Sequence, residues 1–231
     1  MKKNLICIFI TVVLSLMNKS YSQDTTGGML PQQEFKSILK QYTTQEIADT
    51  LWNEIAMHYS GPRRFYHTLR HLDNFYLQLS KCRKNITDWQ SAVIAMVYHD
   101  VIYHSTDRRD EERSAELAMT RLNAIPKFPK EKIAKIGSMI LATKTHAETD
   151  DTDTNLFNDG DMSILGLGRP VYEEYVKNIR AEFSNVPGFD AGRKKVLEYF
   201  LSMNKIFKSD FFHAQYEEAA RRNIKWEITT L

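Results

Sequence analysis

The chain has 231 residues, of which 42% are hydrophobic and 26% are charged, and its 31 basic and 29 acidic side chains give a formal net charge of +2. This composition excludes a disordered or low-complexity chain and a polytopic membrane protein. The near balance of charge also removes any argument for nucleic-acid binding from bulk positive charge.

Residues 1–22 differ in composition from the rest of the chain. Lys2 and Lys3 precede a nearly unbroken apolar run from Leu5 to Met17, and small residues follow it up to Ser22. The run is shorter than the ~20 apolar residues that span a membrane, so the pattern predicts a signal peptide. We therefore expect an exported protein, periplasmic or secreted, with an uncleaved membrane anchor as the alternative.

The chain that remains after cleavage is close to neutral. Removing three lysines and no acid changes the formal charge from +2 to −1. We expect no nucleic-acid partner and no stable membrane association after cleavage, and the sequence leaves the oligomeric state open. Only Cys82 would remain, so no disulfide is available and a packed core must stabilise the fold. Residues 23–33 are polar with paired glycines and predict a flexible leader, and residues 34–231 predict one domain.

The periodicity beyond the leader is helical nearly throughout. Capping signals at Thr43 and Thr87 each predict the start of a helix, and the second of these helices contains the strongly apolar residues 92–97. Apolar residues at three- and four-residue spacing predict further helices near residues 66–79, 111–122, 130–143, 156–165, 170–183, 191–205 and 211–225. No strand pattern and no fixed repeat is present. The sequence therefore predicts an all-α, single-domain bundle.

Histidine and aspartate occupy unusual places in these apolar segments. His99 and Asp100 directly follow the most apolar helix, where an imidazole and a carboxylate are costly without a charge partner or a metal. His67 and His71 are four residues apart, which on a helix puts both rings on one face. Asp161 precedes an apolar run at the predicted start of another element. Each pattern alone is common, but three of them in order, each at a predicted helix end, indicate one shared site.

Five spaced segments carry a more specific signal. They read YHTLRH (66–71), YHDVIY (98–103), RDEERSA (109–115), ATKTH (142–146) and DGDMSILG (159–166). In this order on an all-helical chain they resemble the HD superfamily of metal-dependent phosphohydrolases, and within it a subgroup of predicted phosphohydrolases. The resemblance covers about Glu34 to Lys225. Two features depart from the subgroup: its Asn before Glu111 is Asp110 here, and its members usually look cytoplasmic, so the export signal leaves the substrate context open.

The resemblance implies a ligand set and a proton donor. His71, His99, Asp100 and Asp161 would ligate one divalent metal. The first segment is also similar to the YHNxxH segment of cyclic-nucleotide phosphodiesterases, in which the second histidine binds metal and the first protonates the leaving group. His67 is therefore the general-acid candidate, and an exchange of roles between His67 and His71 is the main alternative.

The ligand types indicate the metal and the reaction. Two imidazoles and two carboxylates suit Mn, Fe, Co, Ni or Zn better than Ca, with Mg as an alternative. Such a metal activates water and polarises a phosphoryl oxygen. We therefore expect hydrolysis of a small-molecule phosphoester, either a monoester or a diester, with nucleotides among the candidates. The alternatives are a more specific nucleotidase or cyclic-nucleotide phosphodiesterase, and a non-catalytic helical protein that uses the metal as a structural staple.

Further residues are expected to support this site. Asp100 and Glu111 join His67 as catalytic candidates; Glu111 either orients a ligand or a water, or is a first-turn acid favoured by the helix dipole. Asp159 either supports Asp161 or caps its helix. Basic side chains beside the segments are expected to contact substrate phosphate, namely Arg64, Arg70, Lys144 and His146. Aromatic residues at core spacing are assigned to the core, namely Tyr172, Tyr175, Phe183, Tyr199 and Phe200.

Overall fold

The computed structural model describes residues 27–103 and 108–231. They form ten α-helices, α2 to α11, and two short 3-10 turns, and this part of the chain contains no strand. The all-α, single-domain bundle is therefore confirmed. None of the helices described is long and apolar enough to cross a membrane. The signal peptide predicted over residues 1–22 lies outside the described residues.

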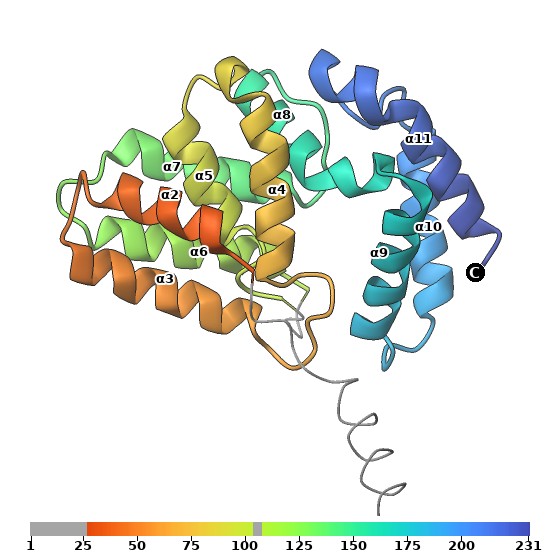
Figure 1. Ribbon diagram of the computed structural model, residues 1–231, viewed down its shortest axis with the longest axis horizontal. Helices are drawn as coiled ribbons and strands as arrows, with labels where there is room; N and C mark the ends of the chain where they lie inside the picture. Colours follow the sequence, from red (N-terminus) through yellow and green to blue (C-terminus); the bar gives the residue numbers. More distant parts are fainter. Residues whose placement is uncertain (1–26, 104–107) are drawn as a thin grey trace, which may run out of the picture.

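The first group of helices packs around α5 (Trp89–Tyr98), which is buried on every side. Nine of its ten residues are buried, and it contacts five of the other helices, α2, α4, α6, α7 and α8. Figure 1 shows α5 in the middle of this group. The surrounding helices are α2 (Met29–Leu39), α3 (Gln45–Tyr59), α4 (Leu69–Lys81), α6 (Asp110–Asn123), α7 (Lys130–Ala142) and α8 (Thr152–Met162).

The second group consists of α9 (Arg169–Glu182), α10 (Phe189–Ser202) and α11 (Asp210–Ile228), which lie together beyond α8 in Figure 1. The turn η3 (Ser163–Gly166) joins the groups by packing against α9 and α11. A Cβ added at Gly166 would collide with Tyr216 of α11, so this contact requires glycine. In contrast to α5, α10 buries only Leu197.

Two predicted helix caps are displaced by one residue. The side chain that caps α3 belongs to Thr44, which accepts the backbone N–H of Ile47, and not to Thr43. The cap of α5 is Asp88, which accepts the N–H of Ser91, and not Thr87. A cap is whichever side-chain oxygen reaches the free N–H groups of the first turn, and two neighbouring polar residues look alike in sequence.

The N-terminal boundary of the fold also differs from the prediction. Residues 29–33, which were expected in the leader, form the start of α2. The backbone N–H of Gly28 donates to Asp73 Oδ2 at 2.6 Å, with Gly28 at a φ of 92°. The ordered domain therefore starts ahead of residue 34.

Helix α8 starts earlier than predicted, and this changes the place of two aspartates. Asp151 caps the helix by accepting the N–H of Asp153, so Asp161 lies in the last turn of α8 and not at the start of an element. Asp159 neither supports Asp161 nor caps α8. Its carboxylate accepts the backbone N–H groups of Lys208 and Ser209, at 2.8 and 2.7 Å, and fixes the start of α11.

Candidate metal centre

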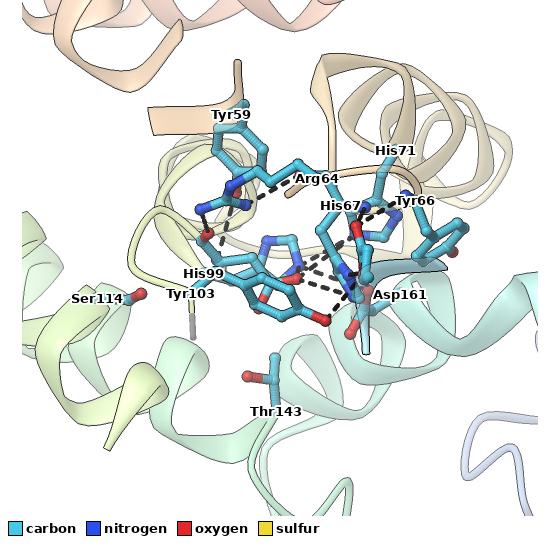
Figure 2. A network of polar contacts seen from close by, with 12 residues as sticks. Tyr59, Arg64, Tyr66, His67, His71, His99, Tyr103, Ser114, Thr143 and Asp161 are labelled. Carbon is cyan, nitrogen blue, oxygen red and sulfur yellow. Dashed lines mark hydrogen bonds and ion pairs between the residues drawn. The ribbon is translucent and has the colours of Figure 1, made fainter. Parts of the chain in front are cut away.

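Three helix ends bring two imidazoles and a carboxylate together. His71 lies in the first turn of α4, His99 caps the end of α5, and Asp161 lies in the last turn of α8. The Nε2 atoms of the two histidines are 3.2 Å apart. Asp161 Oδ1 lies 3.2 Å from His71 Nε2 and 3.6 Å from His99 Nε2. Figure 2 shows these three side chains pointing toward one another, and their ligand atoms are close enough to share one ion.

Asp100 extends the cluster on the side of His99. Its Oδ2 lies 2.9 Å from His99 Nε2 and 4.0 Å from His71 Nε2. Successive residues on a helix point about 100° apart, and His99 and Asp100 converge because α5 ends at Tyr98. The four residues that the sequence singled out as ligands are therefore neighbours in space, with Asp100 at the edge of the group.

The chemistry of these donors fits a cation. The proton on His99 Nδ1 is donated to the Met96 carbonyl at 2.7 Å, which directs the Nε2 lone pair toward the carboxylates. Both histidines are almost fully buried, at 3% and 1% exposure. Lone pairs and carboxylates that face one another in a buried space are unfavourable without a positive charge between them. A divalent transition metal meets this requirement with ligands of the type present.

The charged groups of the cluster shift one another's pKa values. Burial opposes ionisation of Asp161, but the charge of His99 and the hydrogen bonds from His146 and His71 hold its pKa well below the ordinary value. Burial would lower the pKa of His99, but the charge of Asp100 raises it well above the ordinary value. Without a cation, a proton on His99 offsets the carboxylates, and a metal would compete with that proton for the same nitrogen.

His67 lies beside the cluster and not on helix α4, which begins at Leu69. The expectation that His67 and His71 share a helical face is therefore wrong. His67 Nε2 lies 3.7 Å from Asp100 Oδ2, and its Nδ1 lies 2.7 Å from Glu182 Oε2. Burial would lower the pKa of His67, but the charges of Glu182 and Asp100 raise it above the ordinary value.

Glu182, which the sequence analysis did not single out, holds the segment that carries His67. Its Oε1 accepts three consecutive backbone N–H groups, those of Phe65, Tyr66 and His67, at 2.7, 2.8 and 2.8 Å. These contacts fix the backbone of the segment ahead of α4, which begins at Leu69. Its Oε2 also accepts the Tyr103 hydroxyl at 3.1 Å. Burial opposes its ionisation, yet His67 and the backbone donors lower the pKa of Glu182 to about 2.

The sequence did contain a signal for Glu182. The buried residues of α9 are Tyr172, Tyr175, Ile179 and Glu182, so an acid occupies the next position of an apolar stripe. A carboxylate at such a position is expensive unless donors surround it. The apolar spacing instead predicts Phe183 as the core residue at this end of the helix, and Phe183 is only partly buried.

His146 joins the cluster from the loop after α7. Its Nε2 lies 3.0 Å from Asp161 Oδ2, on the oxygen that does not face His71. The backbone of His146 has a φ of 49°, in the left-handed region that few residues other than glycine adopt. Glu111 is half-buried in the first turn of α6; burial and then the charge of Asp100 raise its pKa above the ordinary value. Both residues therefore lie within the electrostatic reach of the cluster.

Arg64 braces the two segments that carry site residues. Its guanidinium donates to the carbonyls of His67, Asp100 and Val101 at 3.0, 2.8 and 3.0 Å. It also lies over the ring of Tyr59, 4.8 Å from the centroid. Arg64 is buried, and three of its five N–H donors are engaged with backbone carbonyls. These contacts tie the segment of His67 to the end of α5, and a contact of Arg64 with phosphate stays a prediction.

Two other basic residues expected near substrate, Lys144 and Arg70, are exposed. Lys144 is exposed and pairs with Glu112. Arg70 is exposed in the first turn of α4. His146 contacts the side chain of a proposed ligand, Asp161, and Arg64 contacts the backbone carbonyl of another, Asp100.

A cavity of about 560 Å³ opens beside the cluster, with His67, His146 and Asp161 in its wall. Phe183 and Phe200, which were expected in the core, are partly buried and line this cavity. Tyr172 is fully buried as expected, whereas Tyr199 is 47% exposed. The aromatic residues of α9 and α10 are therefore divided between the core, the cavity and the surface.

Comparisons of the chain with protein-family models, with curated proteins and with solved structures found no match. Support for a function therefore comes from the geometry of the cluster and from the five sequence segments.

Proposed function

We propose that the protein is a metal-dependent phosphoric ester hydrolase in which His71, His99, Asp100 and Asp161 hold one divalent cation. The observation that carries the proposal is the convergence of two buried imidazoles and two carboxylates at the ends of three packed helices. Mn, Fe, Co, Ni and Zn suit this donor set, with Mg as an alternative. The cation would polarise a phosphoryl oxygen and lower the pKa of a water molecule.

We assign His67 the role of proton donor to the leaving group. Glu182 holds its Nδ1 at 2.7 Å, so the ring is fixed with Nε2 directed toward the side of Asp100. The ring also lines the cavity beside the cluster, where a leaving group has room. A carboxylate on one ring nitrogen orients the imidazole and stabilises its charged form, as general acid catalysis requires. Glu182 is thus a positioning residue for His67.

His146 and Glu111 are assigned supporting roles. The contact of His146 with Asp161 Oδ2 holds this carboxylate so that Oδ1 faces the two histidines. Such contacts fix the orientation of ligands in metal sites generally. Glu111, close enough to Asp100 for the two charges to interact, is placed to orient a water at that edge of the cluster.

Metal analysis and phosphoester hydrolysis together test this proposal. Metal-free protein is reloaded with Mn²⁺, Co²⁺, Ni²⁺, Zn²⁺ or Mg²⁺, bound metal is measured by mass spectrometry, and hydrolysis of aryl phosphates, aryl phosphodiesters and nucleotides is followed. We expect about one ion per chain and turnover with at least one metal. Asp161→Asn should lose both, and Asp150→Asn, the same change on an exposed loop, should lose neither.

Two results would contradict the proposal in different ways. If Asp161→Asn kept its metal and its turnover, the ligand set would be wrong. If the metal bound tightly and every phosphoester in the panel remained intact, the protein would be a helical metal-binding protein without hydrolase activity.

A further inference from the structure

The cavity beside the cluster has an aromatic wall that begins at the proposed proton donor. The His67 ring packs on Tyr103, with centroids 4.3 Å apart. Tyr103 meets Phe183 edge-on at 6.2 Å, and Phe183 stacks on Phe189 at 5.7 Å. A continuous row of rings therefore leads from His67 to the first residue of α10.

A second wall lies on the side of the proposed metal ligand Asp161. His146, which contacts Asp161, meets the ring of Phe200 edge-on at 6.3 Å. Val196 and Gly192 of α10 also line the cavity. A Cβ added at Gly192 meets nothing within 4 Å, so the cavity is open at this point.

Two polar side chains of the cavity wall, Tyr103 and Arg193, are engaged within the protein. The Tyr103 hydroxyl donates to Glu182, and Arg193 donates to Glu227 at 2.7 Å and to the Tyr175 hydroxyl at 3.1 Å. Among the described residues that line the cavity there is no Asn, Gln, Ser, Thr, Lys or Glu, and the polar side chains away from the cluster are Arg108, Arg193 and three tyrosines. A sugar or a nucleobase bound against the row of rings would leave hydroxyl or amide groups without partners, at a cost in affinity.

We propose that this cavity binds the leaving group of the substrate and that this leaving group is an apolar ring alcohol. The inference rests on the proposed function, because the phosphoryl group must lie at the cluster for the ring to enter the cavity. The substrate class is then the phosphate ester of an aromatic alcohol, in preference to a sugar phosphate or a nucleotide. In the reaction the oxygen of a water molecule bonds to phosphorus as the P–O bond to the alcohol breaks. The alcohol oxygen takes a proton from His67, and the proton that the water gives up restores the charged form of His67.

A matched pair of esters tests the preference. Ethyl phosphate and 2-phenylethyl phosphate both release a primary alcohol of similar leaving ability and differ by one phenyl ring. We expect kcat/KM to be about tenfold or more higher for the phenyl ester, because its ring is removed from water in the cavity. Equal kcat/KM values for the two esters would overturn the inference and leave the phosphohydrolase proposal standing.

A substitution that fills the cavity locates the ring. Gly192→Phe adds a ring where the structure has open space, and Ala191→Phe adds the same ring to an exposed neighbour that does not line the cavity. The first variant should bring the ratio of kcat/KM values close to one, and the second should keep it. If both variants kept the preference, the ring would bind elsewhere. Thermal unfolding checks that each variant is folded, and Val196→Trp provides a second filling variant.

Binding of the free alcohol separates this inference from the phosphohydrolase proposal. Saturation-transfer NMR with 2-phenylethanol on metal-free protein should detect binding that Gly192→Phe abolishes and Ala191→Phe retains. If that result were obtained while no phosphoester was hydrolysed, the aromatic cavity would be supported and the phosphohydrolase proposal overturned. If 2-phenylethanol did not bind the unsubstituted protein, the assignment of the cavity would be wrong.

Discussion

The two halves of the candidate site are built in different ways. The metal half lies at the ends of α4, α5 and α8, which pack around or within a fully buried core. The other half is the cavity, whose wall comes from the segment of His67 and from α9 and α10. Helix α10 buries a single residue. The metal ligands are therefore held by well-packed helices, whereas the shape of the cavity depends on α10, a helix with little burial. Metal binding and leaving-group choice should therefore respond to different substitutions.

The largest difference between the halves is expected from the two histidines of the first segment. His71→Ala removes a proposed ligand and should abolish metal binding together with activity. His67→Ala should keep its metal while turnover falls about 10²- to 10⁴-fold, because proton delivery is lost. Bound metal in the two purified variants decides the assignment. The reverse pattern would exchange the roles of His67 and His71.

The second comparison concerns the stability of the two halves. Ile94→Ala in α5 removes a fully buried side chain and should lower the free energy of unfolding by about 2–5 kcal/mol. Val196→Ala in α10 alters a side chain that is 45% exposed, and the change should stay within about 0.5 kcal/mol. Urea unfolding followed by circular dichroism measures both. Similar losses would show that α10 is held as firmly as α5.

A third substitution tests the link between the halves. Glu182→Gln weakens the contact that orients His67, and we expect kcat to fall about 10- to 100-fold with metal content unchanged. The ¹⁵N chemical shifts of the His67 ring should move, which a purely structural defect elsewhere would not cause. Glu173→Gln, an exposed acid on the same helix, is the control. An unchanged His67 spectrum with unchanged kcat would remove Glu182 from the site.

A small gain in stability is expected from Gly192→Ala. Glycine within a helix costs up to about 1 kcal/mol relative to alanine, and the structure has room for the added methyl group. The variant should therefore raise the free energy of unfolding by up to that amount in urea. No gain would mean that α10 unfolds before the rest of the domain, which would sharpen the contrast with α5.

The sequence predicted those features that depend on local patterns. The apolar run of α5 indicated a buried helix, and the costly pair His99 and Asp100 at its end marked the cluster. The apolar spacing near residues 170–183 indicated α9, which runs from Arg169 to Glu182. The apolar and polar periodicity of the chain was enough for the all-α fold class.

The features that the sequence missed depend on distant contacts. Helical spacing put His67 on α4, but Glu182 takes the backbone donors of that segment from 115 residues away. Phe183 and Phe200 have the spacing of core residues, and only the placement of α9 and α10 shows that they border a cavity. Spacing within one helix does not reveal what lies opposite it.

The position of Glu182 in the chain has a consequence for biosynthesis. During translation, the four proposed ligands have all been made once Asp161 has been added, but the residue that fixes His67 follows only at the end of α9. Contacts between residues so far apart in sequence form slowly, because a long loop must close. A nascent chain can therefore contain all four proposed cation ligands before Glu182, the residue that holds His67, has been added.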